Sequence, residues 1–163
     1  MSRLFTALRA LLYMTGFVTL WGWLALMARD AGRQWTVVLP AWLAPLGIVL
    51  MALGGALALA CGATFVVAGR GTPAPFDPPR EFVPVGPYRF VRNPMYVGAA
   101  AVLAGFALVE RSLAVLALAG AGLLLAHLFV VFAEEPGLEE RFGDSYRSYK
   151  ASVRRWIPGR GMS

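Results

Sequence analysis

Residues 86–98, with the sequence GPYRFVRNPMYVG, combine two arginines and two tyrosines where a polar loop becomes an apolar helix. Asn93 and Pro94 predict the helix start, because asparagine can accept hydrogen bonds from the first backbone N–H groups and proline there loses no needed donor. That structural role does not explain the arginines, since arginine near hydrocarbon is costly unless it is paired or reaches water. Arg92 could orient a carboxylate, and the tyrosine faces could attract a cation. The segment therefore predicts a binding site at a membrane edge; the alternative is that the tyrosines only anchor the chain in the interface.

Two adjacent carboxylates, Glu134 and Glu135, follow a later apolar run. Negative charge at the C-terminal end of a helix opposes the helix dipole, which indicates a role other than helix stability. Adjacent helix residues point about 100° apart, so we expect Glu134 to face the other helices and Glu135 to face solvent. His127 lies seven residues before Glu134 on the same face and could accept a proton; the alternative is a structural hydrogen bond across the bundle.

The first segment closely resembles the Gly-x-Tyr-x-x-x-Arg-His/Asn-Pro-x-Tyr-x-Gly signature of the isoprenylcysteine carboxyl methyltransferase and phospholipid methyltransferase superfamily. Its members are membrane enzymes that use S-adenosylmethionine. Downstream, residues 134–138 (EEPGL) and 142–149 (FGDSYRSY) resemble the C-terminal Glu-Glu-x-x-Leu and Phe-Gly-x-x-Tyr-x-x-Tyr block of that family. The resemblance covers about residues 70–158, and two separated motifs in the right order are more specific than either alone.

The resemblance implies a site for S-adenosylmethionine, with S-adenosylhomocysteine as the product. The residues that match cofactor-binding positions are Phe82, Val83, Tyr88, Asn93, Pro94, Met95, Tyr96, Glu134 and Glu135. Arg92 and His127 are the candidates for a catalytic role. Asn93 stands where the prenylcysteine enzymes have histidine, and Val130 stands where they have a substrate-binding arginine. These departures argue against a prenylcysteine carboxylate as the substrate.

The composition independently requires a membrane. The chain is 58% hydrophobic and 15% charged, and its apolar residues form long runs at about 8–28, 44–68, 94–109 and 113–133. The first run could be mistaken for a signal peptide, but it is long and lacks a good cleavage site before Arg29. Pro136 is expected to end the last helix. The fold predicted is one all-α integral membrane domain (1–163), with two spans in 1–69 and the cofactor-binding region with spans three and four in 70–158.

Tyr146, Tyr149, Val153 and Trp156 recur at helical spacing with basic residues between them. This pattern predicts a C-terminal amphipathic helix that lies in the membrane interface. Within the predicted spans, glycines and alanines at three- and four-residue spacing predict helices that pack closely.

The basic residues set the expected orientation. Two precede the first span, four lie in residues 69–93 and six follow the last span, so twelve of the fifteen share one side. For four spans, the positive-inside rule then predicts that both termini and the site face the cytoplasm. The membrane expected is a bacterial inner membrane. Contact with anionic lipid headgroups accounts for the net charge of +6, so no nucleic acid partner is expected.

No metal site is expected, because Cys61 is the single cysteine and His127 the single histidine. The residues and the resemblance together predict methyl transfer from S-adenosylmethionine to an amphiphilic, lipid-like substrate that enters from the bilayer. One alternative is an NADPH-dependent membrane lipid or steroid reductase, whose cofactor would also lie at helix ends. Another is a small membrane protein without catalytic activity.

Overall fold

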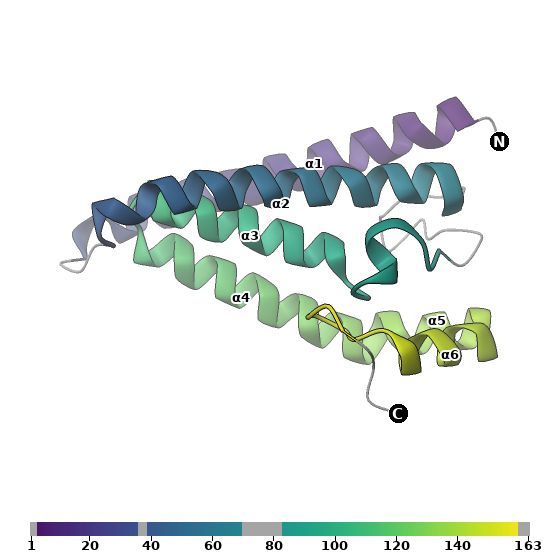
Figure 1. Ribbon diagram of the computed structural model, residues 1–163. Helices are drawn as coiled ribbons and strands as arrows, with labels where there is room; N and C mark the ends of the chain where they lie inside the picture. The colour runs from purple at the N-terminus through teal and green to yellow at the C-terminus, as the bar shows by residue number, and fades with distance from the viewer. Residues whose placement is uncertain (1–2, 36–38, 70–82, 160–163) are drawn as a thin grey trace.

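Four main helices run back and forth in the computed structural model, which describes residues 3–35, 39–69 and 83–159. They are α1 (Arg3–Ala31), α2 (Ala44–Thr64), α3 (Pro94–Val109) and α4 (Leu113–Phe129). Neighbours along the chain are antiparallel, so the ends of α2 and α4 and the starts of α1 and α3 lie at one end of the bundle (Figure 1). The predicted site residues gather at that end, except Phe82, which lies outside the described residues.

Three helical segments are long and apolar enough to cross a membrane: Leu4–Gln34, Ala41–Ala68 and Leu113–Phe142. Large apolar side chains along them are exposed, as hydrocarbon surroundings permit; Leu12 is 67% exposed and Leu53 is 65% exposed. The chain is therefore an integral membrane protein. Helix α3 has 16 residues, about 24 Å at 1.5 Å per residue, which is short for a span. The fourth span stays a prediction.

Helices α2 and α3 pack with glycine against glycine. A Cβ atom on Gly54 would lie 2.6 Å from the carbonyl oxygen of Gly98, and a Cβ on Gly105 would lie 2.5 Å from that of Gly47. Any larger side chain at these positions would push the backbones apart, so the close approach depends on the missing Cβ atoms. The prediction of close packing through small residues is confirmed for this helix pair.

Helix α4 does not end at Pro136, so that expectation was wrong. It passes through a π-helical turn (Val130–Glu134) into α5 (Glu135–Phe142), and the whole segment Leu113–Phe142 is helical. A π-helical turn locally replaces the i→i−4 hydrogen-bond pattern, in which Pro136 cannot donate. The helix can therefore continue past proline, and the two glutamates lie within it.

Gly143, with φ +54°, ends α5, and α6 (Asp144–Ser152) follows. The C-terminal helix was expected to reach Trp156, but it ends four residues earlier, because Val153 is extended. The backbone N–H of Arg92 donates to the Arg154 carbonyl at 2.9 Å, and that of Asn93 donates to the Arg155 carbonyl at 3.2 Å. Residues 153–156, here called the C-terminal strap, thus lie across the start of α3, and the carbonyls of Arg154 and Arg155, which follow the end of α6, accept these bonds.

Candidate functional site

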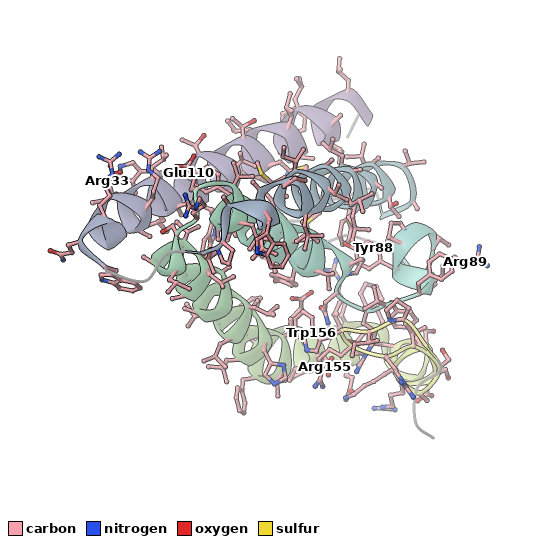
Figure 2. All side chains as sticks on the ribbon, turned by 60° about the vertical axis from the view of Figure 1, so that its left-hand side comes forward. Arg33, Tyr88, Arg89, Glu110, Arg155 and Trp156 are labelled. Carbon is pink, nitrogen blue, oxygen red and sulfur yellow. The ribbon has the colours of Figure 1, made fainter. Side chains whose placement is uncertain are left out.

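Four side chains from three parts of the chain meet where the strap crosses the bundle. The Tyr96 hydroxyl donates to Glu134 Oε2 at 3.0 Å, and the Trp156 indole Nε1–H donates to His127 Nδ1 at 3.1 Å. The Trp156 ring also lies 6.4 Å from the Tyr96 ring, measured between centroids. We call Tyr96, His127, Glu134 and Trp156 the aromatic–carboxylate cluster; Figure 2 shows Trp156 beside the segment that joins α4 to α5.

Local structure positions each member of this cluster. Tyr96 is the third residue of α3, whose first residue, Pro94, is among the fully buried side chains and fixes the helix start as predicted. Glu134 is the last residue of the π-helical turn, 38 positions beyond Tyr96. Trp156 is carried in by the strap. The cluster therefore forms only when α3, the end of α4 and the strap have all come together.

Asn93 joins the strap to the site rather than capping α3. Its side chain makes no capping bond; its Nδ2 donates to the Arg155 carbonyl at 3.2 Å, and the residue is 6% exposed. The predicted capping role of the Asn93 side chain was therefore wrong. In the strap, the Arg155 carbonyl lies next to Asn93. It accepts hydrogen bonds from both the side-chain Nδ2–H and the backbone N–H of Asn93.

Glu135 lies at the centre of a second group, the ion-pair cluster of Arg92, Glu135, Lys150 and Arg155. Arg155 donates two hydrogen bonds to its carboxylate, from Nε to Oε1 at 2.8 Å and from Nη2 to Oε2 at 2.9 Å. Arg92 Nη1 lies 3.0 Å from Glu135 Oε1. Lys150 Nζ lies 3.7 Å away. Glu135 is 4% exposed, so the expectation that it faces solvent was wrong. Glu134 and Glu135 do point in different directions, but both meet protein. Glu134 faces α3, and Glu135 faces α6 and the strap.

Electrostatics at this end of the bundle follow from burial and from Glu135. The hydrogen bonds that Arg155 donates to Glu135 raise the pKa of the guanidinium. Burial, with the charge of Glu135 adding to it, raises the pKa of the nearby Tyr146 hydroxyl to about 12. Tyr146 is therefore neutral at physiological pH. The charged groups of the ion-pair cluster are the Glu135 carboxylate and the three cations that surround it.

The other predicted cofactor residues lie around the same end. Tyr88 is buried, its ring packs edge-on against Phe65 with centroids 5.1 Å apart, and its carbonyl accepts from the Tyr149 hydroxyl at 2.6 Å. Burial is the main cause that raises the pKa of Tyr88, with smaller contributions from Cys61 and from the charge of Glu134. Val83 is buried and Met95 is partly buried.

Trp156 and Arg155 are the site residues that the sequence reasoning missed. They were interpreted as parts of an interfacial helix, since tyrosine, valine and tryptophan recur at helical spacing there. No local pattern distinguishes a helix from a strap at residues 153–156, because the strap is held by backbone bonds to residues about 60 positions earlier.

A carboxylate beside aromatic rings can bind a cationic group, which is the chemistry that the aromatic–carboxylate cluster offers.

His127 has a defined hydrogen-bonding state in this arrangement. Because Nδ1 accepts from Trp156, the neutral imidazole carries its proton on Nε2. A role as proton acceptor, predicted for His127, would require Trp156 to move away from Nδ1. In the geometry described, His127 offers a donor at Nε2.

Comparison with known proteins identifies the family. Residues 42–145, well over half of the chain, match the phospholipid methyltransferase family. A protein of Haemophilus influenzae described as uncharacterized is 49% identical over 35 residues, which are 22% of this chain and 56% of that protein. The chain thus spans only about half the length of that relative, and the likeness carries no activity with it. The family match agrees with the resemblance seen in both sequence motifs, and the chain belongs to the phospholipid methyltransferase family, whose members use S-adenosylmethionine.

Proposed function

We propose that this protein transfers a methyl group from S-adenosylmethionine to an amphiphilic, lipid-like acceptor at the end of the bundle where α3, α5 and the strap meet. The observation that carries the proposal is the hydrogen bond of 3.0 Å between Tyr96 and Glu134. It joins one residue from each of the two motifs that resemble the methyltransferases. A carboxylate is thereby held in place beside two aromatic rings.

The residues present suit this cofactor. Glu134 could accept hydrogen bonds from the ammonium group or the ribose hydroxyls, and the faces of Tyr96 and Trp156 could attract the positive sulfonium. Apolar surface from Val83 and Met95 would cover the remainder. When bound, S-adenosylmethionine supplies an electrophilic methyl group.

The task of the chain is to align the two reactants and to exclude water. Tyr96 orients the Glu134 carboxylate, and the strap holds Trp156 over the same region, so the cluster is organised in advance. The acceptor would approach along the exposed apolar surfaces of the helices, as expected for a substrate dissolved in the bilayer.

Binding of S-adenosylhomocysteine to Glu134→Gln and to Glu140→Gln tests the cofactor site. Both variants lose one negative charge, but Glu140 is exposed on α5 and lies outside both clusters. Loss of a charge-assisted hydrogen bond of about 1.5–3 kcal/mol should weaken binding roughly tenfold to a hundredfold in Glu134→Gln, while Glu140→Gln binds like the wild type. Isothermal titration calorimetry of the full-length protein in detergent measures both. Equal affinities would remove Glu134 from the site.

The reaction itself is tested in membranes that contain the overproduced protein. S-adenosylmethionine labelled in its methyl group should pass the label into the lipid extract, and Glu134→Gln should lose most of this transfer. Label in the lipid extract at the level of membranes without the protein would contradict a lipid-like acceptor.

A further inference from the structure

We infer that His127 is a positioning residue of the proposed methyl-transfer site and sets how strongly that site prefers a positively charged cofactor. This role rests on the proposed function and adds a selectivity to it. His127 would act through Trp156, whose indole Nε1–H donates to His127 Nδ1 at 3.1 Å. It would therefore neither accept a proton from the substrate nor contact the cofactor itself.

The strap fixes the backbone before Trp156 but not the orientation of its ring. Its bonds to the bundle are made by the carbonyls of Arg154 and Arg155 and by the Arg155 side chain. A tryptophan side chain keeps two torsions when its backbone is fixed, so the plane of the indole needs a contact of its own. The hydrogen bond to His127 supplies that contact, because it requires the indole N–H to point at Nδ1. The two rings lie 5.9 Å apart between centroids.

The indole held in this way completes a corner of two aromatic rings beside a carboxylate. Its ring lies 6.4 Å from the Tyr96 ring, and the two planes are inclined by 67°. The Tyr96 hydroxyl in turn donates to Glu134 at 3.0 Å. The face of an aromatic ring attracts a cation and its edge does not, so the attraction depends on the orientation of the indole. An indole free to rotate would lose part of this discrimination.

The position of His127 in the chain suits this task. His127 and Glu134 belong to one continuous helical segment, Leu113–Phe142. The acceptor for the indole and the carboxylate of the site therefore have a fixed spacing, and the hydrogen bond sets Trp156 relative to both. Leucine would fill a similar space without accepting the bond, whereas asparagine carries an amide oxygen at the branch position that Nδ1 occupies in histidine.

Binding of two unreactive ligands to the full-length protein in detergent tests this role. Sinefungin carries an ammonium group where S-adenosylmethionine has its methyl-sulfonium group, and S-adenosylhomocysteine is neutral there. The ratio of their dissociation constants, measured by isothermal titration calorimetry, reports the preference for charge. His127→Leu should reduce the preference for sinefungin by about threefold to thirtyfold, the range of a cation–π interaction, and leave the affinity for S-adenosylhomocysteine nearly unchanged. His127→Asn should retain most of the preference.

A double-mutant cycle with Trp156→Phe shows whether His127 acts through Trp156. Adding His127→Leu to Trp156→Phe should cause no further loss of the preference, because the indole N–H is already absent. A further loss would mean that His127 contacts the ligand itself, and the positioning role would be overturned.

The outcomes separate this role from the proposed function. The role of His127 alone is overturned if the wild type and His127→Leu show the same preference, or if His127→Leu weakens both ligands equally, as a merely structural residue would. It is also overturned if His127→Asn loses as much of the preference as His127→Leu. Wild-type protein that binds neither ligand would overturn the proposed function, and the role of His127 with it.

Discussion

At the scale of single residues, two neighbouring carboxylates have different environments. Glu134 accepts a hydrogen bond from a tyrosine on α3, whereas Glu135 is held by two arginines and a lysine. A buried carboxylate is tolerated only with partners of opposite charge, and its removal leaves those partners buried without a counter-charge. Glu135 therefore stabilises the packing of the strap, which in turn holds Trp156 at the candidate site.

Glu135→Gln should lower the free energy of unfolding by about 3–5 kcal/mol, because Arg92 and Arg155 would lose their shared counter-charge. Glu140→Gln, which removes an exposed carboxylate from the same short helix, should change it by less than about 0.5 kcal/mol. Thermal unfolding in detergent compares the two variants. The same melting temperature in both would mean that the ion-pair cluster adds nothing to stability.

Trp156→Phe should release His127 from its fixed tautomer, because phenylalanine keeps a ring and loses the N–H donor. The chain contains one histidine, so protein labelled with ¹⁵N-histidine gives a single set of imidazole signals. The wild type should show the Nε2–H tautomer, and Trp156→Phe should show a mixture of tautomers. A mixture already in the wild type would rule out the Trp156–His127 bond.

At the scale of secondary-structure elements, the π-helical turn and the glycine contacts determine how the helices meet. The turn at Val130–Glu134 carries α4 through to Phe142, so that α5 extends beyond the apolar part of the helix and supports α6. The contacts between α2 and α3 set the position of the α3 start, and with it Tyr96. Packing between α2 and α3, outside the aromatic–carboxylate cluster, therefore determines the geometry there.

Gly54→Ala and Gly55→Ala form a matched pair of adjacent substitutions in α2. The new Cβ at Gly54 would meet the Gly98 backbone, whereas at Gly55 nothing lies within 4 Å. We expect Gly54→Ala to destabilise the protein by about 1–3 kcal/mol, and Gly55→Ala to be neutral or to stabilise by up to about 1 kcal/mol through helix propensity. Thermal unfolding of both variants provides the comparison, and equal behaviour would contradict the close approach of α2 and α3.

At the scale of the whole molecule, the antiparallel helices bring both ends of the described chain to the same end of the bundle as the candidate site (Figure 1). In the sequence, twelve of the fifteen basic residues lie at the start of α1, between α2 and α3 or after the apolar part of α4. By the positive-inside rule, this end should face the cytoplasm. A site at the cytoplasmic surface would have access to a soluble cofactor and to lipid from the inner leaflet.

Single cysteines at Ser2, Thr72 and Ser163, introduced after Cys61→Ala, should all be protected from an impermeant thiol reagent added to intact cells. A cysteine at Gln34, exposed at the other end of α1, should react. Permeabilised cells, in which all four positions should react, show that each cysteine is accessible. Labelling of any of the first three from outside would contradict the predicted orientation.

The sequence by itself determined the apolar helices that form the bundle, and the family. Charged residues, glycines and prolines mark the ends of the apolar runs. Both boundaries of α3, Pro94 and Val109, and the start of α2, Ala44, were therefore predicted correctly. The motifs at residues 86–98 and 134–149 predicted the family before any contact was known. These features depend on residues close together in the chain, and local pattern is sufficient to read them.

Only the tertiary structure decided what each side chain at the site contacts. Glu135 is buried because Arg155, 20 residues away, binds it, and the Asn93 side chain bonds to a carbonyl 62 residues away rather than capping its own helix. The helix ends before the strap, where the carbonyls of Arg154 and Arg155 accept from the backbone N–H groups of Arg92 and Asn93. In each case the local alternative was reasonable, but a distant partner offered a hydrogen bond or a counter-charge that the buried group needed, and the periodicity of a sequence does not contain that partner.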